Sequence, residues 1–305
     1  MKPSSARRIR AALLLSAALS PVVPAQLSER AGSSGYKLLK LDISPRAAAL
    51  SGAGAALPRL EQGISPAIEV PENVRLSAGW TSGYARLDGE IEHASWIVPA
   101  PGGGAFGRLR FQGFQGIEGY DDEARPTGTY TASTWAAGVG YALGLERFVP
   151  GLATGLALHG GMNHVAAFTS YAGWADLGAR WTRGDFALGA AVRNWGLASK
   201  SDQDPETLPL QAQVGGAYLR GLPAGWTLAV LADARWTVDE AWTLPLAVES
   251  RWGVLALRTG YAIGLDESRP SLGVGVQGAT WGLDASLAWH GALGLSPGMS
   301  VSAGL

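Results

Sequence analysis

Residues 226–237 read WTLAVLADARWT, an alternating stretch with a tryptophan at its start and another near its end. Every second residue from Trp226 to Trp236 is apolar, whereas the residues between them include Asp233 and Arg235. Side chains of a β-strand point alternately to the two faces of a sheet. The stretch therefore predicts a strand with one apolar face and one largely polar face.

The spacing of the two tryptophans predicts that this strand crosses a membrane. Ten residue steps at roughly 3.3 Å each span about 33 Å, and a tilt of ~45° leaves about 24 Å of height. That height matches the lipid-facing band of ~25 Å in an outer-membrane barrel, which carries an aromatic girdle at each rim. Trp242 and Trp252 repeat the spacing in the next segment. The two segments predict a hairpin joined at 237–241.

The composition suits the wall of such a barrel. The chain has 43 glycines, 12 tryptophans, 16% charged residues and a formal net charge of −1. These values are typical neither of a nucleic-acid-binding protein nor of a disordered tail. The sequence has no cysteine, which excludes a disulfide framework and a lipid attached through a thioether.

Residues 1–25 are predicted to be a signal peptide. Arg7, Arg8 and Arg10 precede the short apolar run AALLLSAALSPVV, and Val23-Pro24-Ala25 fits the small-residue cleavage pattern. The run is too short to span a bilayer as a helix, and no later run approaches the ~20 apolar residues that a membrane helix needs. We therefore expect an exported chain that resides in the outer membrane, surrounded by its lipids.

The alternating pattern recurs from Asn73 to the end of the sequence, for example in 106–114, 208–218 and 283–290. Counting such segments gives about 14 strands, an even number as bacterial single-chain barrels require. Long connectors (82–90, 115–128, 197–208 and 264–271) alternate with short ones (182–185, 221–225 and 252–253), as surface loops and periplasmic turns do. The predicted fold class is all-β: a transmembrane antiparallel β-barrel over residues 73–305.

Residues 26–72 lack clean alternation and have two interpretations. The segment is either a periplasmic tail or a hatch folded into the barrel mouth. We favour the hatch, because Leu38, Leu39, Leu41 and Ile43 would otherwise expose apolar surface to water.

Several stretches resemble a known family. SPRAAALSGAGAAL (44–57), preceded by YKLLKL (36–41), resembles the N-terminal signature of the PorV/PorQ family, within the larger group similar to the fatty-acid transporter FadL. FQGFQGIEGYDDEARPTGTY (111–130), and AVRNWG (191–196) followed by LPLQAQVGGAY (208–218), resemble the PorQ branch. Gln62 and Ser65 stand near the positions where the family has an acidic residue and an asparagine. The hatch-signature residues are Leu38, Leu39, Arg46, Leu50, Gly52 and Pro66.

The resemblance implies an accessory or anchor protein of the type IX secretion system, with secretion-system or surface attachment-complex proteins as partners. The alternative is a FadL-like transporter of hydrophobic small molecules across the outer membrane. Two acidic loops are candidate docking surfaces for a partner; calcium binding and plain solvation are the other interpretations of such loops. The candidate docking residues are Glu118, Tyr120, Asp121, Asp122, Glu123, Asp202, Asp204 and Glu206.

The strand pattern also predicts charged residues that face the barrel lumen. They either pair with one another across the interior, which we favour because both signs are present, or line a path for solutes. These residues are Arg108, Arg110, Asp176, Arg180, Asp233, Arg235, Glu249 and Arg251.

No stretch carries convincing catalytic chemistry. GVGVQG (273–278) spells a dinucleotide-binding motif, but it alternates like one strand and lacks the helix that would hold a pyrophosphate. GLSPG (294–298) spells a nucleophile elbow, but Pro297 has no N–H for the oxyanion, so a turn is expected there. His159 and His164 are an odd number of residues apart, on opposite faces of a strand. We expect a non-enzymatic protein without cofactor, metal or nucleic-acid partner; an outer-membrane hydrolase is the remaining rival.

Overall fold

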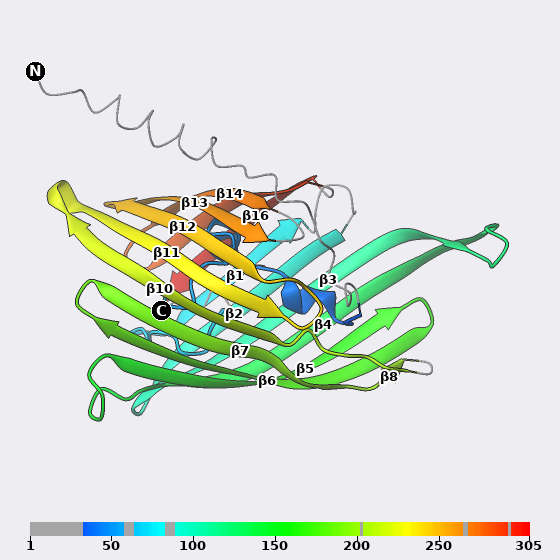
Figure 1. The fold of residues 1–305 in the computed structure, drawn as a ribbon, viewed down its shortest axis with the longest axis horizontal. Coiled ribbons are helices and arrows are strands. Elements are labelled where there is room, and N and C mark those ends of the chain that lie inside the picture. The colour runs from blue at the N-terminus through cyan, green and yellow to red at the C-terminus, as the bar shows by residue number, and fades with distance from the viewer. Residues whose placement is uncertain (1–32, 58–63, 83–88, 202–203, 265–267, 292–293) are drawn as a thin grey trace, which may run out of the picture.

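A computed structural model of the chain describes residues 33–57, 64–82, 89–201, 204–264, 268–291 and 294–305 (Figure 1). Fourteen antiparallel strands close into a barrel, in which the first strand pairs with the last through Arg75 and Gly304. This arrangement confirms the predicted fold class. The predicted signal peptide lies outside the described residues. No helix in the described ranges is long and apolar enough to cross a membrane.

The strands are named in chain order, and all but β8 and β9 belong to the barrel. Each barrel strand pairs with its neighbours in sequence, and β7 pairs with β10 across the short β8–β9 sheet. The bounds are β1 Arg75–Ser82, β2 Gly89–Ala100, β3 Gly103–Tyr120, β4 Pro126–Gly144, β5 Leu152–Val165, β6 Phe168–Arg183, β7 Phe186–Ala198, β8 Lys200–Ser201, β9 Asp204–Pro205, β10 Gln211–Leu222, β11 Trp226–Thr237, β12 Thr243–Trp252, β13 Leu255–Gly264, β14 Arg269–Gln277, β15 Trp281–His290 and β16 Gly294–Gly304; a 3-10 turn, η3 Pro223–Gly225, joins β10 to β11.

The hairpin predicted from the tryptophan spacing is β11–β12. Trp226 pairs with Trp252, and their rings stack with centroids 5.7 Å apart and planes 12° from parallel. Along β11 the outward Val230 is 42% exposed, whereas the inward Leu231 and Asp233 are only 2% and 5% exposed. Alternation of apolar and polar residues thus places the apolar set on the outer wall and the polar set in the lumen.

Two local predictions were wrong. Residues 115–128 do not form a long loop, because β3 and β4 continue as a paired ribbon and only 121–125 form the turn between them. GLSPG (294–298) lies at the start of β16 and not in a turn, since Pro297 pairs with Leu287 of β15. In contrast, GVGVQG (273–278) lies mostly within β14, as its alternation predicts.

Residues 34–57 occupy the lumen. We call residues 34–57 the plug: they contain a 3-10 helix, η1 Lys37–Lys40, and a short α-helix, α2 Pro45–Ala49. The dark-blue segment in Figure 1 lies inside the ring of strands. The plug contributes Tyr36, Leu39, Leu50 and Ala53, all at most 1% exposed, to the buried core. Most of the apolar core is therefore the contact between plug and wall, and Ile68 packs separately on Ile97 and Phe106.

Candidate functional site: the lumen and its plug

The local fold of the plug follows from its sequence. Ser44 caps α2, because its side-chain oxygen accepts a hydrogen bond from the N–H of Ala47 at 3.1 Å, and Pro45 fits the first helical turn. Gly52 ends the turn with φ of 79°, and its N–H donates to the carbonyl of Ala47 at 2.9 Å. A side-chain carbon on Gly52 would lie 2.7 Å from a guanidinium nitrogen of Arg235. A glycine is therefore required at this hatch-signature position.

Apolar contacts hold the plug against two parts of the wall. Leu38 and Leu39 point to opposite sides, since Leu38 packs on Ile91 of β2 whereas Leu39 packs on Trp174 of β6. The C-terminal part of the plug packs on an alanine-rich inner face of β7, β10, β11 and β12. This cluster comprises Leu50, Ala53, Ala56, Leu57, Ala187, Ala217, Ala229, Leu231 and Ala247.

Glycines on the inner wall let the N-terminal chain approach closely. A side-chain carbon on Gly189 of β7 would overlap the carbonyl of Ala55, and one on Gly260 of β13 would lie 2.5 Å from the carbonyl carbon of Leu50. Gly155 of β5 likewise makes room for Pro66, which is buried. Because any larger residue would push the chain away, the wall is shaped for this segment.

A buried charge cluster ties α2 to β12. Arg46 donates to both oxygens of Glu249, at 2.9 Å and 3.0 Å. Glu249 also accepts from Arg251 at 2.7 Å and from Arg258 at 2.6 Å, so three guanidinium groups surround one carboxylate. Arg258 also pairs with Asp284 of β15. Buried charges need such partners, since desolvation makes an unpaired charge costly.

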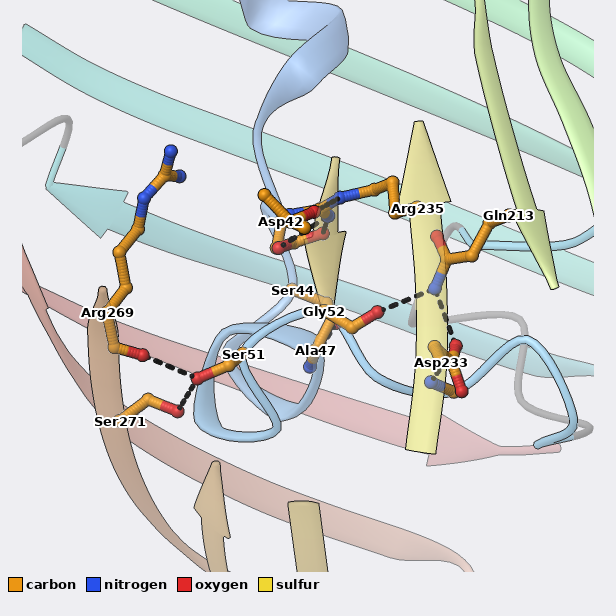
Figure 2. A network of polar contacts seen from close by, with 12 residues as sticks. Asp42, Ser44, Ala47, Ser51, Gly52, Gln213, Asp233, Arg235, Arg269 and Ser271 are labelled. Carbon is orange, nitrogen blue, oxygen red and sulfur yellow. Dashed lines mark hydrogen bonds and ion pairs between the residues drawn. The ribbon is translucent and has the colours of Figure 1, made fainter. Parts of the chain in front are cut away.

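A second network holds the residues that follow α2 (Figure 2). Asp233 accepts from the backbone N–H groups of Gly54 and Ala55 at 2.9 Å and 2.8 Å. Gln213 donates to the carbonyl of Gly52 at 2.9 Å and to Asp233 at 2.6 Å. These contacts satisfy plug backbone groups that would otherwise be buried without partners.

Further contacts join the plug to the end of the barrel that carries the β11–β12 turn and the start of β14. Arg235 pairs with Asp42 at 3.3 Å, and the hydroxyl oxygens of Ser51 and Ser271 are 2.7 Å apart. Asp239, in the β11–β12 turn, accepts from Lys40 at 2.5 Å and from the hydroxyl of Ser34 at 2.6 Å. Burial alone would raise the pKa of Asp239, but these hydrogen bonds and the charge of Lys40 lower it below its usual value.

Beside β10, a bulge between β6 and β7 also contacts the plug. Asn194 has φ of 60°, and its N–H donates to Asp176 at 2.8 Å. Its side-chain amide donates to the carbonyl of Leu39 at 3.4 Å. Asp176 also lies 3.0 Å from His159, whose ring stacks on Trp174. Among the described residues, no cluster of three or more His, Asp or Glu could hold a metal ion.

The structure places the eight predicted lumenal charges on inward positions. Glu249 pairs with Arg251, but Asp233 and Arg235 contact the plug instead of each other. Arg108 is buried, with its guanidinium 5.2 Å from the ring of Phe106, and Arg110 is half-buried. Arg180 is half-buried and donates to Thr182.

The candidate docking residues separate into two groups. Glu118, Tyr120 and 121–123 are at the end of the β3–β4 ribbon, where Tyr120 donates to Glu118. Asp202 lies outside the described residues, and Asp204 begins β9. Glu206 is half-buried and accepts from Ser170 of β6 at 3.0 Å, so it supports the wall. Within the described ranges, no hydrogen bond or ion pair joins the two groups.

Sequence reasoning missed several residues that hold the plug. Arg258, Gln213 and Ser271 occupy inward positions that the alternation rule already implied, and only their partners were unknown. Lys40 and Asp239 lie outside the alternating strands, so periodicity gives no signal for them.

The seated plug leaves little space in the lumen. A cleft of about 70 Å³ beside it is lined by polar residues, among them Asp42 and Arg235, and by apolar residues such as Ile91. Cavities that bind benzene are about twice as large, ~150 Å³. Larger hollows of about 1120 Å³ and 680 Å³ are lined by outward residues such as Trp80, Trp135 and Val214, so lipid fills them if the barrel lies in a membrane.

No protein-family model and no curated protein sequence matches the chain. Among solved structures, it is similar to the toluene transporter TbuX of Ralstonia pickettii, with a TM-score of 0.61 and 10% identity over 90% of this chain and 99% of that one. The monoaromatic hydrocarbon channel CymD has a TM-score of 0.57 and 11% identity, covering 87% and 98%. The Pseudomonas putida toluene transporter TodX has a TM-score of 0.51 and 10% identity, covering 92% and 98%. At such identities the likeness shows the fold, that of outer-membrane β-barrels.

Proposed function

We propose that this chain is an outer-membrane channel for small hydrophobic molecules, closed at rest by residues 34–57. The observation that carries the proposal is a lumen filled by a plug with defined ties to the wall. The likeness in fold to a toluene transporter and to hydrocarbon channels supports it. The hydrogen bonds and ion pairs between plug and wall then hold the channel closed. A change that weakens them lets the plug move and opens the lumen.

The chemistry of the plug contact favours apolar solutes. The inner face of β7, β10, β11 and β12 that contacts the plug is made of Ala187, Ala217, Ala229, Leu231 and Ala247. Displacement of the plug exposes this apolar stripe to the lumen. A hydrophobic solute replaces the lost plug contacts there, whereas a hydrated ion gains nothing from such a surface.

An engineered disulfide between plug and wall tests the proposal. In the variant Ser51→Cys/Ser271→Cys the two sulfur atoms replace hydroxyl oxygens 2.7 Å apart, within reach of a disulfide. The native chain has no cysteine, so no other disulfide competes. Cells that carry the chain should take up radiolabelled toluene faster than cells without it. Oxidation of the double variant should abolish the gain, and reduction should restore it.

The single variant Ser51→Cys is the control, since it changes the plug without a lock. Uptake that persists in the oxidised double variant, with the disulfide verified by mass, would contradict plug displacement. No uptake above the empty cells would contradict the channel itself.

The second candidate is an accessory or anchor protein of type IX secretion, as the resemblance to the PorQ branch implies. The observation that favours it is the β3–β4 ribbon, which extends past the neighbouring strands and ends in the acidic residues 121–123 (Figure 1). Deletion of 117–126 should then abolish co-purification of the surface partner from native membranes while the barrel still assembles. Unchanged co-purification would remove this candidate.

A further inference from the structure

Two stretches of the chain fill different sides of the lumen. Residues 50–57 of the plug pack on β7, β10, β11 and β12, whereas residues 64–68, which are also buried, lie against β2 to β6. A side-chain carbon on Gly178 of β6 would overlap the hydroxyl oxygen of Ser65. Ile68 packs on a cluster from β2 to β5 that comprises Ile97, Phe106, Ala142 and Ala157. The wall of β2 to β6 therefore stays covered when residues 50–57 move.

The two parts of the plug are held by different contacts. The ion pairs to the wall come from its first part, residues 34–49, through Lys40, Asp42 and Arg46. Residues 50–57 have no charged side chain and meet the wall through apolar contacts and hydrogen bonds. A hydrophobic solute can replace apolar contacts but not ion pairs. It therefore opens a slot between residues 50–57 and the wall while the first part of the plug stays in place.

The wall of this slot carries a row of small inward residues in register. From β7 through β10 to β14, the paired residues of the row are Ala187, Ala217, Leu231, Ala247, Gly260 and Ser271. All of them except Leu231 are alanine, glycine or serine. Leu231 lies between Ala217 and Ala247 on the neighbouring strands, so no other side chain of the row reaches as far into the slot.

Leu231 contacts the part of the plug that the solute displaces. It is buried in one cluster with Leu50 and Leu57 of the plug. Among the buried wall residues of that cluster it alone is larger than alanine, and Leu219, which packs against the cluster, is only partly buried. A solute that replaces the plug contacts must therefore pass the side chain of Leu231.

We propose that Leu231 sets the upper size of the solutes that pass through the lumen. The inference rests on the proposed function and deepens it by naming the substrate class, hydrocarbons with a single aromatic ring. One ring is similar in bulk to a leucine side chain, so it takes the place of Leu50 or Leu57 against the wall. A fused bicyclic hydrocarbon such as naphthalene needs the room that Leu231 occupies.

The test measures uptake of radiolabelled toluene and naphthalene by cells that carry the full chain, corrected for cells without it. Leu231→Ala should raise the naphthalene-to-toluene ratio about tenfold or more, because small changes of size in a hydrophobic pocket alter discrimination by that factor. Leu231→Met keeps the volume and should keep the native ratio.

Leu38→Ala is the matched control for a loosened plug. It removes the same kind of buried side chain from the contact with Ile91 of β2, away from the slot. It should change the uptake of both solutes by the same factor. A native ratio in Leu231→Ala, or a ratio that rises equally in Leu38→Ala, would overturn the role of Leu231 and leave the channel standing. No uptake of either solute by the native chain would remove the channel and this inference with it.

Discussion

Replacement of Glu249 by glutamine should release the plug more effectively than removal of the Arg46 side chain. Among the described residues, Glu249 is the one carboxylate that contacts Arg46, Arg251 and Arg258 together. Glu249→Gln keeps the size of the side chain and removes its charge, so these guanidinium groups lose a shared counter-ion. Arg46→Ala removes only the contact from the plug, and Glu249 keeps its other two arginines.

The two variants should therefore differ in magnitude. Loss of a charge-assisted hydrogen-bonded contact costs about 1.5–3 kcal/mol, which is what Arg46→Ala removes from the seated state. Breaking a buried charge cluster by removing one partner costs about 3–5 kcal/mol. Because about 1.4 kcal/mol is a factor of ten, the unseated fraction should rise roughly 10- to 150-fold in Arg46→Ala and roughly 150- to 5000-fold in Glu249→Gln.

The assay is maleimide labelling of Ala53→Cys in an otherwise cysteine-free chain. Ala53 belongs to the plug and is fully buried against the wall, so a thiol there reacts only after the plug leaves. Arg220→Ala is the matched control, because Arg220 forms an exposed pair with Asp185 far in sequence from the plug. Labelling that rises more in Arg46→Ala than in Glu249→Gln, or rises equally in Arg220→Ala, would refute this reasoning.

Three further outcomes follow from the same contacts. Gly189→Ala places a carbon where the Ala55 carbonyl lies, so it should destabilise the seated plug by about 1–3 kcal/mol. Maleimide labelling of Ala53→Cys should then rise, whereas it should stay unchanged in the control Gly160→Ala, which changes an outward residue. The pKa of Asp239 in the folded protein is below its usual value near 3.8. The contact of Asp239 with Lys40 and Ser34 should therefore be fully present above that pH and lost as the pH falls through the lower folded pKa. Acid-induced labelling of Ala53→Cys that survives in Asp239→Asn would contradict this. Val230→Arg on the lipid face should lower the free energy of unfolding in vesicles by about 2–4 kcal/mol, and Trp226→Arg at the rim by at most about 1 kcal/mol; equal losses in urea titrations would contradict the membrane placement.

The barrel could be predicted from the sequence because its signal repeats along the chain. Alternation in β11 and β12, with tryptophans ten residues apart, is enough by itself to specify which face meets lipid. The same rule assigns the inward positions of Arg235 and Glu249. Local patterns suffice here, since each strand contacts its sequence neighbour.

The contacts of the plug could not be predicted, because they join residues about 200 positions apart, such as Arg46 and Glu249. The periodicity of a strand predicts whether a side chain faces the lumen or the lipid, but it does not predict which residue that side chain contacts. It also missed the length of the β3–β4 ribbon, since the glycines and acidic residues of 115–128 are typical of a loop. There the cross-strand pair of Ile117 with Tyr130 continues the sheet in spite of local composition.

The pairing of β1 with β16 has a consequence for biogenesis. The ring closes only when the last strand pairs with the first, and residues 34–57 precede every strand of that ring in the chain. A wall that closed without them would leave its apolar inner residues, such as Leu231 and Ala247, facing an unfilled lumen.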